Sequence, residues 1–126
     1  MMRRGTAQQV YDTSVGHLIR QGKPASEDGI ECSYRTKDGL KCAIGCLITD
    51  KEYRVSMEKN NVCAINRHGI LPEPLVQFID LLEELQSLHD DILTKSKVID
   101  KEFIRVAKNI AARYDLSSDI LTKGLI

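Results

Sequence analysis

Residues 73–90 carry the feature that most constrains the fold, a long apolar stripe at helical spacing. Pro72 and Pro74 stand at its start, and proline suits the first turn of a helix, where its missing N–H would have no partner anyway. A helix with one apolar side has to bury that side against other elements, so the sequence predicts a packed, largely helical domain. The stripe consists of Leu75, Ile79, Leu82, Leu85 and Leu88, widened by Val76, Phe78 and Leu81.

Two further segments have helical periodicity and recognisable ends. The segment 6–21 begins at Thr6, whose hydroxyl suits an N-cap, and stops before Gly22, the residue type that most often follows a helix. The segment 100–114 repeats apolar residues at helical spacing behind Asp100, a second N-cap candidate. The tail predicts one more short helix, starting at Ser117 or Ser118.

The segment between these helices alternates as a strand does. In residues 30–35 the apolar side chains occupy every second position, and Lys37-Asp38-Gly39 is a turn signal that leads into a second run at 40–43. This pattern predicts a short β-hairpin. The apolar residues 42–48 fit a strand or a buried helix equally well, because short apolar runs do not distinguish the two.

We therefore expect an α+β fold that is mainly helical, within a single domain that spans residues 1–126. The predicted order is an N-terminal helix, a short β-hairpin and then two or three amphipathic helices. A chain of this length buries about two-thirds of its unfolded surface and needs no second domain.

The charge balance excludes several classes of protein. Lysine plus arginine equals aspartate plus glutamate, so the formal net charge is zero. Nucleic-acid binders usually carry a basic excess, which makes nucleic acid an improbable partner. Zero net charge also removes self-repulsion and favours a homo-oligomer. No apolar run is long enough for a membrane helix and the arginines near the N-terminus precede no apolar core, so we expect a cytoplasmic protein.

Four cysteines are expected to be reduced in such a compartment, and we interpret them as buried side chains that fill the core. The alternative is a thiol- or zinc-dependent site built on Cys32, Cys42 and Cys46, completed by a histidine such as His89. Only Cys42 and Cys46 have a spacing near that of zinc ligands, so the leading expectation is no metal and no cofactor. No cysteine is tied by spacing to a base, and we predict that the chain is not an enzyme.

Two charged motifs receive ordinary structural interpretations. The sequence His89-Asp90-Asp91 resembles a metal-binding pair of phosphohydrolases, but it stands at a helix end and we interpret it as solvated. The basic residues between positions 95 and 108 are interrupted by Asp100 and Glu102, and we interpret them as a solvated helix face. They are Lys95, Lys97, Lys101, Arg105 and Lys108.

One stretch of the chain resembles a family. It reads C-x-Y-R, a glycine, then K-C-A-I-G-x-L-I-x-D-x-x-Y, and its residues are Cys32, Tyr34, Arg35, Gly39, Lys41, Cys42, Ala43, Ile44, Gly45, Leu47, Ile48, Asp50 and Tyr53. Together with H-L-x-x-Q-G at positions 17–22 and L-Q-x-x-H-D at 85–90, it is similar to small uncharacterised proteins of tailed phages, prophages and proteobacteria. Thr49 stands where that group often has proline. The resemblance implies a phage or mobile-element accessory protein in a bacterial host cell, and it implies no chemistry.

These observations together predict a protein that acts by binding another protein, in keeping with accessory proteins that modulate or inhibit a host factor. Arginine and tyrosine contribute most often to interface energies, so the candidate contact residues are Tyr34, Arg35, Lys37 and Asp38. The alternative for the first two is structural, with Tyr34 in the core and Arg35 paired with Glu31 or Asp50. We expect a bacterial protein as the partner.

Overall fold

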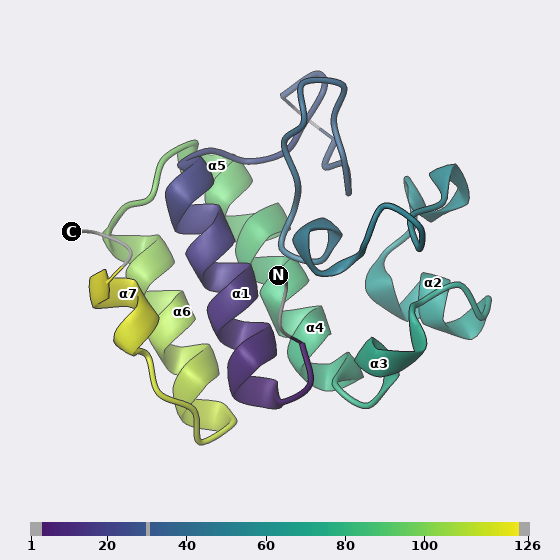
Figure 1. The fold of residues 1–126 in the computed structure, drawn as a ribbon. Coiled ribbons are helices and arrows are strands. Elements are labelled where there is room, and N and C mark those ends of the chain that lie inside the picture. The colour runs from purple at the N-terminus through teal and green to yellow at the C-terminus, as the bar shows by residue number, and fades with distance from the viewer. Residues whose placement is uncertain (1–3, 30, 124–126) are drawn as a thin grey trace.

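The computed structural model describes residues 4–29 and 31–123, and this part of the chain folds into helices joined by loops (Figure 1). Two of the elements, η1 and η2, are 3₁₀-helices, and η3 is a π-helix. In chain order they are α1 (Ala7–Gln21), η1 (Gly45–Leu47), η2 (Val55–Met57), α2 (Val62–Arg67), α3 (Glu73–Val76), α4 (Ile79–Ser87), η3 (Leu88–Leu93), α5 (Thr94–Ser96), α6 (Lys101–Arg113) and α7 (Asp119–Lys123).

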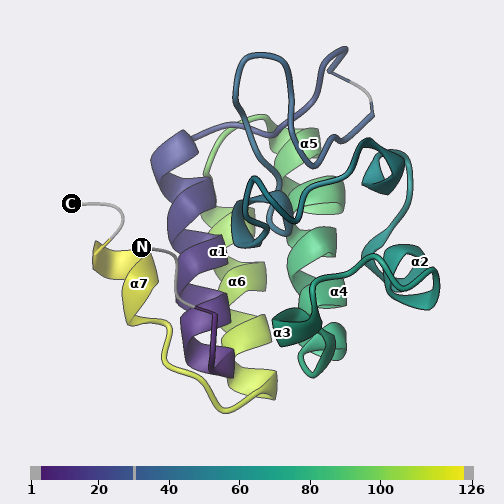
Figure 2. The same ribbon diagram turned by 45° about the vertical axis from the view of Figure 1, so that its right-hand side comes forward.

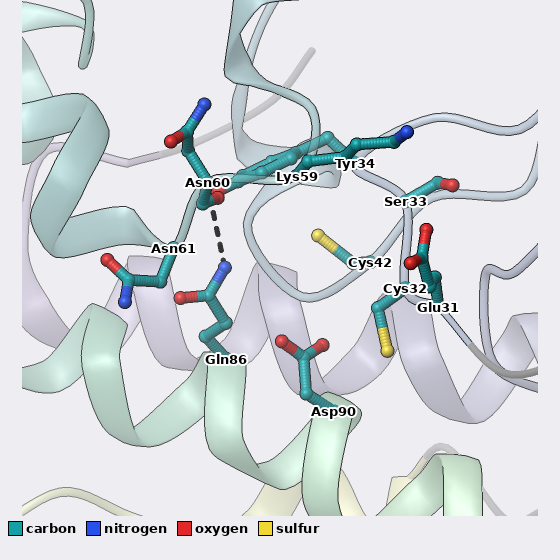
Figure 3. A pocket seen from close by; sticks show the side chains of 10 residues that line it. All are labelled: Glu31, Cys32, Ser33, Tyr34, Cys42, Lys59, Asn60, Asn61, Gln86 and Asp90. Atoms are coloured by element: carbon teal, nitrogen blue, oxygen red, sulfur yellow. Dashed lines mark hydrogen bonds between the residues drawn. The ribbon is translucent and has the colours of Figure 1, made fainter.

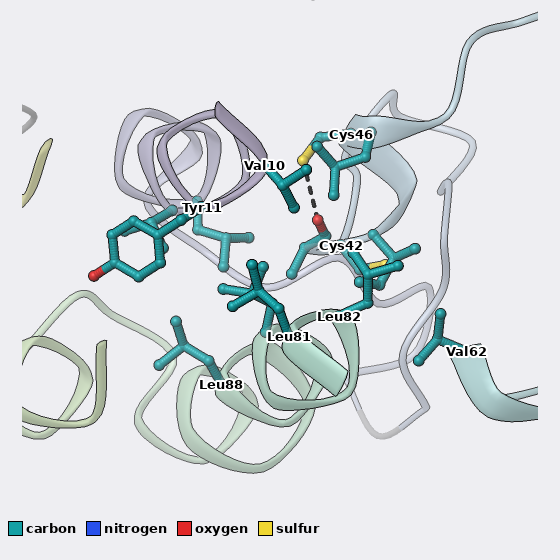
Figure 4. Packing of buried hydrophobic residues seen from close by; sticks show 14 of the residues in the cluster. Val10, Tyr11, Cys42, Cys46, Val62, Leu81, Leu82 and Leu88 are labelled. Carbon is teal, nitrogen blue, oxygen red and sulfur yellow. Dashed lines mark hydrogen bonds between the residues drawn. The ribbon is translucent and has the colours of Figure 1, made fainter. Parts of the chain in front are cut away.

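The helices α1, α4 and α6 form the centre of the molecule. Helix α1 packs on α4 and is covered by α7, while α6 packs on α4 and on η3 (Figures 1 and 2). The apolar sides of these helices face one another, and Tyr11, Leu81 and Leu88 lie between them (Figure 4). Residues 22–29 and 31–44 form loops at one end of this helical core, and residues 55–76 lie along one side of it.

Helices α1 and α6 confirm their predicted ends. The Thr6 side chain accepts a hydrogen bond from the Gln9 backbone N–H, and Gly22 ends α1 in the left-handed conformation with φ 76°. The Asp100 side chain caps α6 in the same way, through the Phe103 backbone N–H. These caps satisfy backbone donors that have no partner inside the helix.

The prediction of one continuous helix over residues 73–90 is wrong. The backbone leaves the helical conformation at Phe78 (φ −106°, ψ 21°), which separates α3 from α4. Beyond Ser87 the helix widens into the π-helix η3. The apolar stripe was the correct signal for burial, since Leu75, Leu82 and Leu85 are all buried.

The predicted β-hairpin and the α+β class are also wrong. The described residues contain no strand, and the two runs meet at a single isolated bridge, which joins Arg35 to Lys41 around the predicted turn. The reason lies far along the chain, because the Glu58 carboxylate accepts the backbone N–H groups of Tyr34 (2.9 Å) and Arg35 (3.2 Å). A side chain thus takes the place of a strand partner.

The apolar run 42–48, which fits a strand or a buried helix, forms only a short 3₁₀-helix that is buried. It turns through η1, which begins at Gly45. A Cβ atom at Gly45 would lie 2.0 Å from the Tyr34 carbonyl oxygen, so the chain approaches itself too closely for any side chain there. Among the described residues, no helix combines the length and apolar character that crossing a bilayer requires.

Candidate functional site

A pocket of about 350 Å³ opens between three segments that are distant in sequence (Figure 3). Residues 31–34 form one wall, residues 59–61 form a second, and α4 with η3 forms the third. Tyr34 and Cys42 contribute its apolar lining, and Gln86 and Asp90 present polar groups from the helix. The distinctive C-x-Y-R segment and the L-Q-x-x-H-D motif therefore meet at one place.

The π-helix η3 supplies one of the two carboxylates that line the pocket, that of Asp90. His89 and Asp90 are neighbours in the chain, yet His89 is 0% exposed whereas Asp90 lies at the edge of the pocket. The Thr94 hydroxyl donates to the Asp90 carbonyl oxygen across this wider turn. Short π-helical segments occur often at functional sites, because they re-aim one side chain without ending the helix.

The hydrogen bonds of His89 determine which of its two ring nitrogens carries the proton. Its Nε2 lies 2.9 Å from the backbone nitrogen of Ala25, which can only donate, so Nε2 accepts and carries no proton. The remaining nitrogen Nδ1 therefore carries the proton and donates it to Asp90 Oδ1 over 2.8 Å. His89 is a neutral, fully bonded side chain, and the interpretation of His89-Asp90-Asp91 as a solvated helix end is wrong for this residue.

Cys32 completes a cluster with these two residues. One ligand atom from each of Cys32, His89 and Asp90 lies within 4.8 Å of the others. Burial, and then the neighbouring Asp90 carboxylate, raise the pKa of the Cys32 thiol to about 12. The thiol is thus protonated at neutral pH and is a poor nucleophile.

This cluster offers few free ligands to a metal ion. A histidine binds a metal through a nitrogen lone pair, and both nitrogens of His89 are already engaged. Cys32 and Asp90 remain as ligands, and structural zinc sites use four. The structure brings together two of the four predicted zinc ligands, Cys32 and His89, and adds Asp90.

The other two predicted ligands have different surroundings. Cys42 lines the pocket, but its sulfur accepts the Gly45 backbone N–H at 3.2 Å and burial raises its pKa. Cys46 does not line the pocket, and its thiol donates to the Ala43 carbonyl (Figure 4). Cys42 is 2% exposed and Cys46 is 9% exposed, which confirms that these two thiols fill the core.

Tyr34 and Gln86 hold the pocket walls together. The Tyr34 hydroxyl donates to the Asn60 carbonyl oxygen (2.7 Å) and accepts from Gln86 Nε2 (3.1 Å). Gln86 Oε1 accepts the Val62 backbone N–H at 2.8 Å. The three walls are therefore joined by hydrogen bonds, and the pocket is formed before any ligand arrives.

The predicted contact residues divide into two pairs. Tyr34 is 3% exposed and belongs to the core. Arg35 pairs with Asp50 at 2.8 Å and stacks over the Tyr53 ring at 4.6 Å, which is the structural alternative considered for it. Lys37 and Asp38 lie exposed at the tip of the loop.

Sequence reasoning missed the residues that come from the other walls. Gln86 and Asp90 were visible in the L-Q-x-x-H-D motif, but nothing in the sequence placed that motif beside Cys32. Asn60 and Asn61 carried only a turn signal. Their meeting depends on the docking of α2 against α4, which is a tertiary contact.

We compared the chain with models of protein families, with curated proteins and with solved structures, and none of them matches. Inference about function therefore starts from the pocket and its charges.

Proposed function

We propose that this protein is a small binding protein that recognises a basic segment of a partner protein. One lysine or arginine side chain of the partner enters the pocket and pairs with Asp90. The proposal rests on the position of the Asp90 carboxylate and on its bonding partners. This carboxylate faces a preformed pocket, and among the described residues it bonds only to the uncharged donors His89 and Cys32.

The surroundings of Asp90 support a cationic ligand. No lysine or arginine in the described part of the chain forms an ion pair with Asp90 or with Glu31 on the opposite wall. Lys59 lines the same pocket, yet no ion pair joins it to either carboxylate. A hydrogen bond between an entering guanidinium and a partly buried carboxylate is charge-assisted, and such bonds are the strong ones.

A second hollow supports a ligand with more than one basic residue. It measures about 290 Å³ and shares Glu31, Cys32, Ser33 and Lys59 with the first pocket. Glu27, Asp28 and Glu58 add carboxylates to its lining, and the one arginine there, Arg35, is already paired with Asp50. The two hollows flank the same stretch of backbone. An extended basic segment that crosses residues 31–33 would meet acidic groups in both hollows.

The phage resemblance gives the proposal a biological setting. An accessory protein of a phage or mobile element acts on proteins of the bacterial cell, so the partner is a bacterial protein with an exposed basic segment. The exposed Lys37 and Asp38 stand at the tip of the same loop and are available for contacts at the rim. Binding is favoured over catalysis because the Cys32 thiol at the pocket is protonated and both ring nitrogens of the neighbouring His89 are already bonded.

The test is a titration of isotope-labelled protein with an acetylated Arg-Arg amide, followed by NMR chemical shifts. We expect saturable shifts at residues 31–34 and 59–61, and no shifts with the citrulline analogue, which keeps the shape and lacks the charge. Asp90→Asn keeps an acceptor for His89 but removes the charge, and it should weaken binding roughly tenfold to hundredfold.

Asp91→Asn is the matched control, because Asp91 is the next residue, is exposed and bonds to Ser87. It should retain most of the affinity. Equal binding of the arginine and citrulline peptides, or equal losses in the two variants, would refute the proposal.

A divalent metal ion is the second candidate ligand, favoured by the short distances within the Cys32 cluster. Zinc would take Cys32 and Asp90, and the imidazole of His89 could join only by giving up its bond to Ala25. Native mass spectrometry with elemental analysis tests this. If the protein binds one zinc per chain, and if Cys32→Ser loses the ion while Cys63→Ser keeps it, then the ligand of the pocket is a metal ion and not a basic side chain.

A further inference from the structure

The charges of this neutral chain are separated along the sequence. Residues 68–94 contain six acidic residues and no lysine or arginine, whereas residues 95–113 contain six basic residues and two acidic ones. The first stretch includes α3, α4 and η3, and the second includes α5 and α6. Zero net charge therefore conceals one acidic and one basic region.

The basic region contains a groove on α6. This basic groove has a volume of about 570 Å³, with Ile99 and Ile104 as its apolar lining and Lys101, Arg105 and Lys108 around it; the one acidic residue in the lining is Asp100, whose side chain caps α6. Arg105 pairs with Glu102 on its own helix. Lys101 and Lys108 have no ion pair within the described residues. Val98, at 54% exposed, extends the apolar area next to the groove.

The acidic region presents a complementary surface. Glu73, Asp80 and Glu83 are exposed on α3 and α4, with the partly buried Val76 and Ile79 near them. We call this group the acidic surface. Asp80 forms no hydrogen bond or ion pair with any described residue.

The two regions adjoin on the outside of the molecule. Arg113 of α6 and Glu84 of α4 form an ion pair across the two helices, and both side chains remain partly exposed. The exposed sides of α4 and α6 therefore border each other. An acidic strip beside a basic strip is self-complementary when a second copy is turned by a two-fold rotation.

We propose that the chain forms a two-fold homodimer in which the acidic surface of each copy docks on the basic groove of the other. A second copy is favoured as the occupant because the chain itself supplies a surface with the opposite charge and its own apolar side chains. Two neutral molecules also meet without long-range repulsion. This inference does not depend on the pocket at Asp90.

The interface would be governed by charge and therefore by salt. Exposed ion pairs contribute little individually and are screened over about 10 Å at 0.1 M salt. We expect a dimer at low ionic strength that dissociates as salt is added. Sedimentation velocity over a range of protein concentrations, at low and high salt, measures this.

Charge reversal tests the contact directly. The double variant Lys101→Glu/Lys108→Glu places acidic grooves against acidic surfaces and should be monomeric at low salt. Asp80→Lys reverses a charge on the other side of the contact and should weaken the dimer as well. A mixture of the two variants should form a heterodimer, because each reversed charge then meets its opposite.

The control is Lys23→Glu/Lys51→Glu, which changes the net charge by the same amount at exposed lysines outside α6. It should remain dimeric, and circular dichroism should show that all variants keep their helix content. The proposal is overturned if the wild-type chain sediments as a monomer at low salt, if the control dissociates as readily as the groove variant, or if the mixture fails to associate.

Discussion

Gly45 is the residue on which the close packing of the C-x-Y-R segment depends. Its backbone φ and ψ are not the reason, because the constraint is space: the Tyr34 carbonyl occupies the position a Cβ atom would take. The neighbour is backbone and cannot swing aside as a flexible side chain can. Glycine, which has no Cβ atom, is the one residue that permits this approach.

We expect Gly45→Ala to lower the free energy of unfolding by about 3 kcal/mol, at the upper end of the cost of overfilling a core. Urea unfolding measures the change. The matched control is Gly16→Ala in α1, where the nearest atoms, at 3.2 and 3.3 Å, belong to the side chains of Arg20 and Ile120. Alanine also favours a helix, so this variant should lie within about 1 kcal/mol of wild type. Similar losses at the two positions would contradict the argument.

The four thiols should differ in reactivity in the folded protein. Burial raises the pKa of Cys46 to about 12 and also raises that of Cys42, while Cys32 and Cys63 are partly accessible beside carboxylates that keep them protonated. We expect slow alkylation by iodoacetamide at neutral pH, with Cys63 and Cys32 modified before the buried pair. Mass spectrometry of a time course would show this order, and rapid modification of Cys42 before unfolding would disprove it.

At the scale of elements, the ends of helices were more predictable than their interiors. Thr6, Gly22 and Asp100 act locally, through bonds to backbone groups within one turn, so the sequence was enough to place them. The change from α4 to the π-helix η3 has no comparable local signal. It depends on the contacts that η3 makes with α6 and through His89, which are settled only when the whole chain has folded.

The cap of α6 gives a direct measurement at this scale. Asp100→Ala removes the acceptor for the Phe103 N–H and should cost about 1 kcal/mol of unfolding free energy. Asp38→Ala, at an exposed turn without a cap bond, should change stability by no more than about 0.5 kcal/mol. Thermal and urea unfolding of both variants would compare them, and equal stabilities would argue against the cap.

At the scale of the whole molecule, long-range polar bonds decided where the expected fold was wrong. The alternation in residues 30–35 and the turn at 37–39 are real features of the sequence, but Glu58 supplies the bonds that a strand would have supplied. The same explanation applies to the pocket, whose walls are joined by Tyr34 and Gln86 across 52 positions of sequence. Periodicity cannot report a contact of this kind.

A second long-range contact makes stability depend on pH. Arg4 holds the Glu52 carboxylate by two hydrogen bonds of 2.7 and 2.8 Å, and this contact lowers the pKa of Glu52 from 4.5 to about 2. Because the folded pKa lies below the unfolded value, the stabilisation is complete above pH of about 5 and disappears as the pH falls towards about 2. Arg4→Gln should therefore be less stable than wild type at neutral pH, and the difference should shrink towards pH 2, where only the bond from Arg4 to the Leu47 carbonyl still distinguishes the two proteins.

Urea unfolding of both proteins at a series of pH values would measure this difference. Glu52→Gln serves as the control, since it removes the titrating group and should show the same convergence in acid. A gap between wild type and Arg4→Gln that stays constant down to pH 2 would mean that the ion pair is not its origin.

The bond between His89 and Ala25 has a consequence for the loop at residues 22–29. A single imidazole ring touches that loop on one side and the pocket carboxylate on the other. A ligand that displaces the Asp90 side chain would also displace the His89 imidazole, which is bonded to it, and with the imidazole the backbone of the loop at Ala25. Events inside the cavity would thus be communicated to the outer surface of the protein, where Lys97 already anchors Gly29.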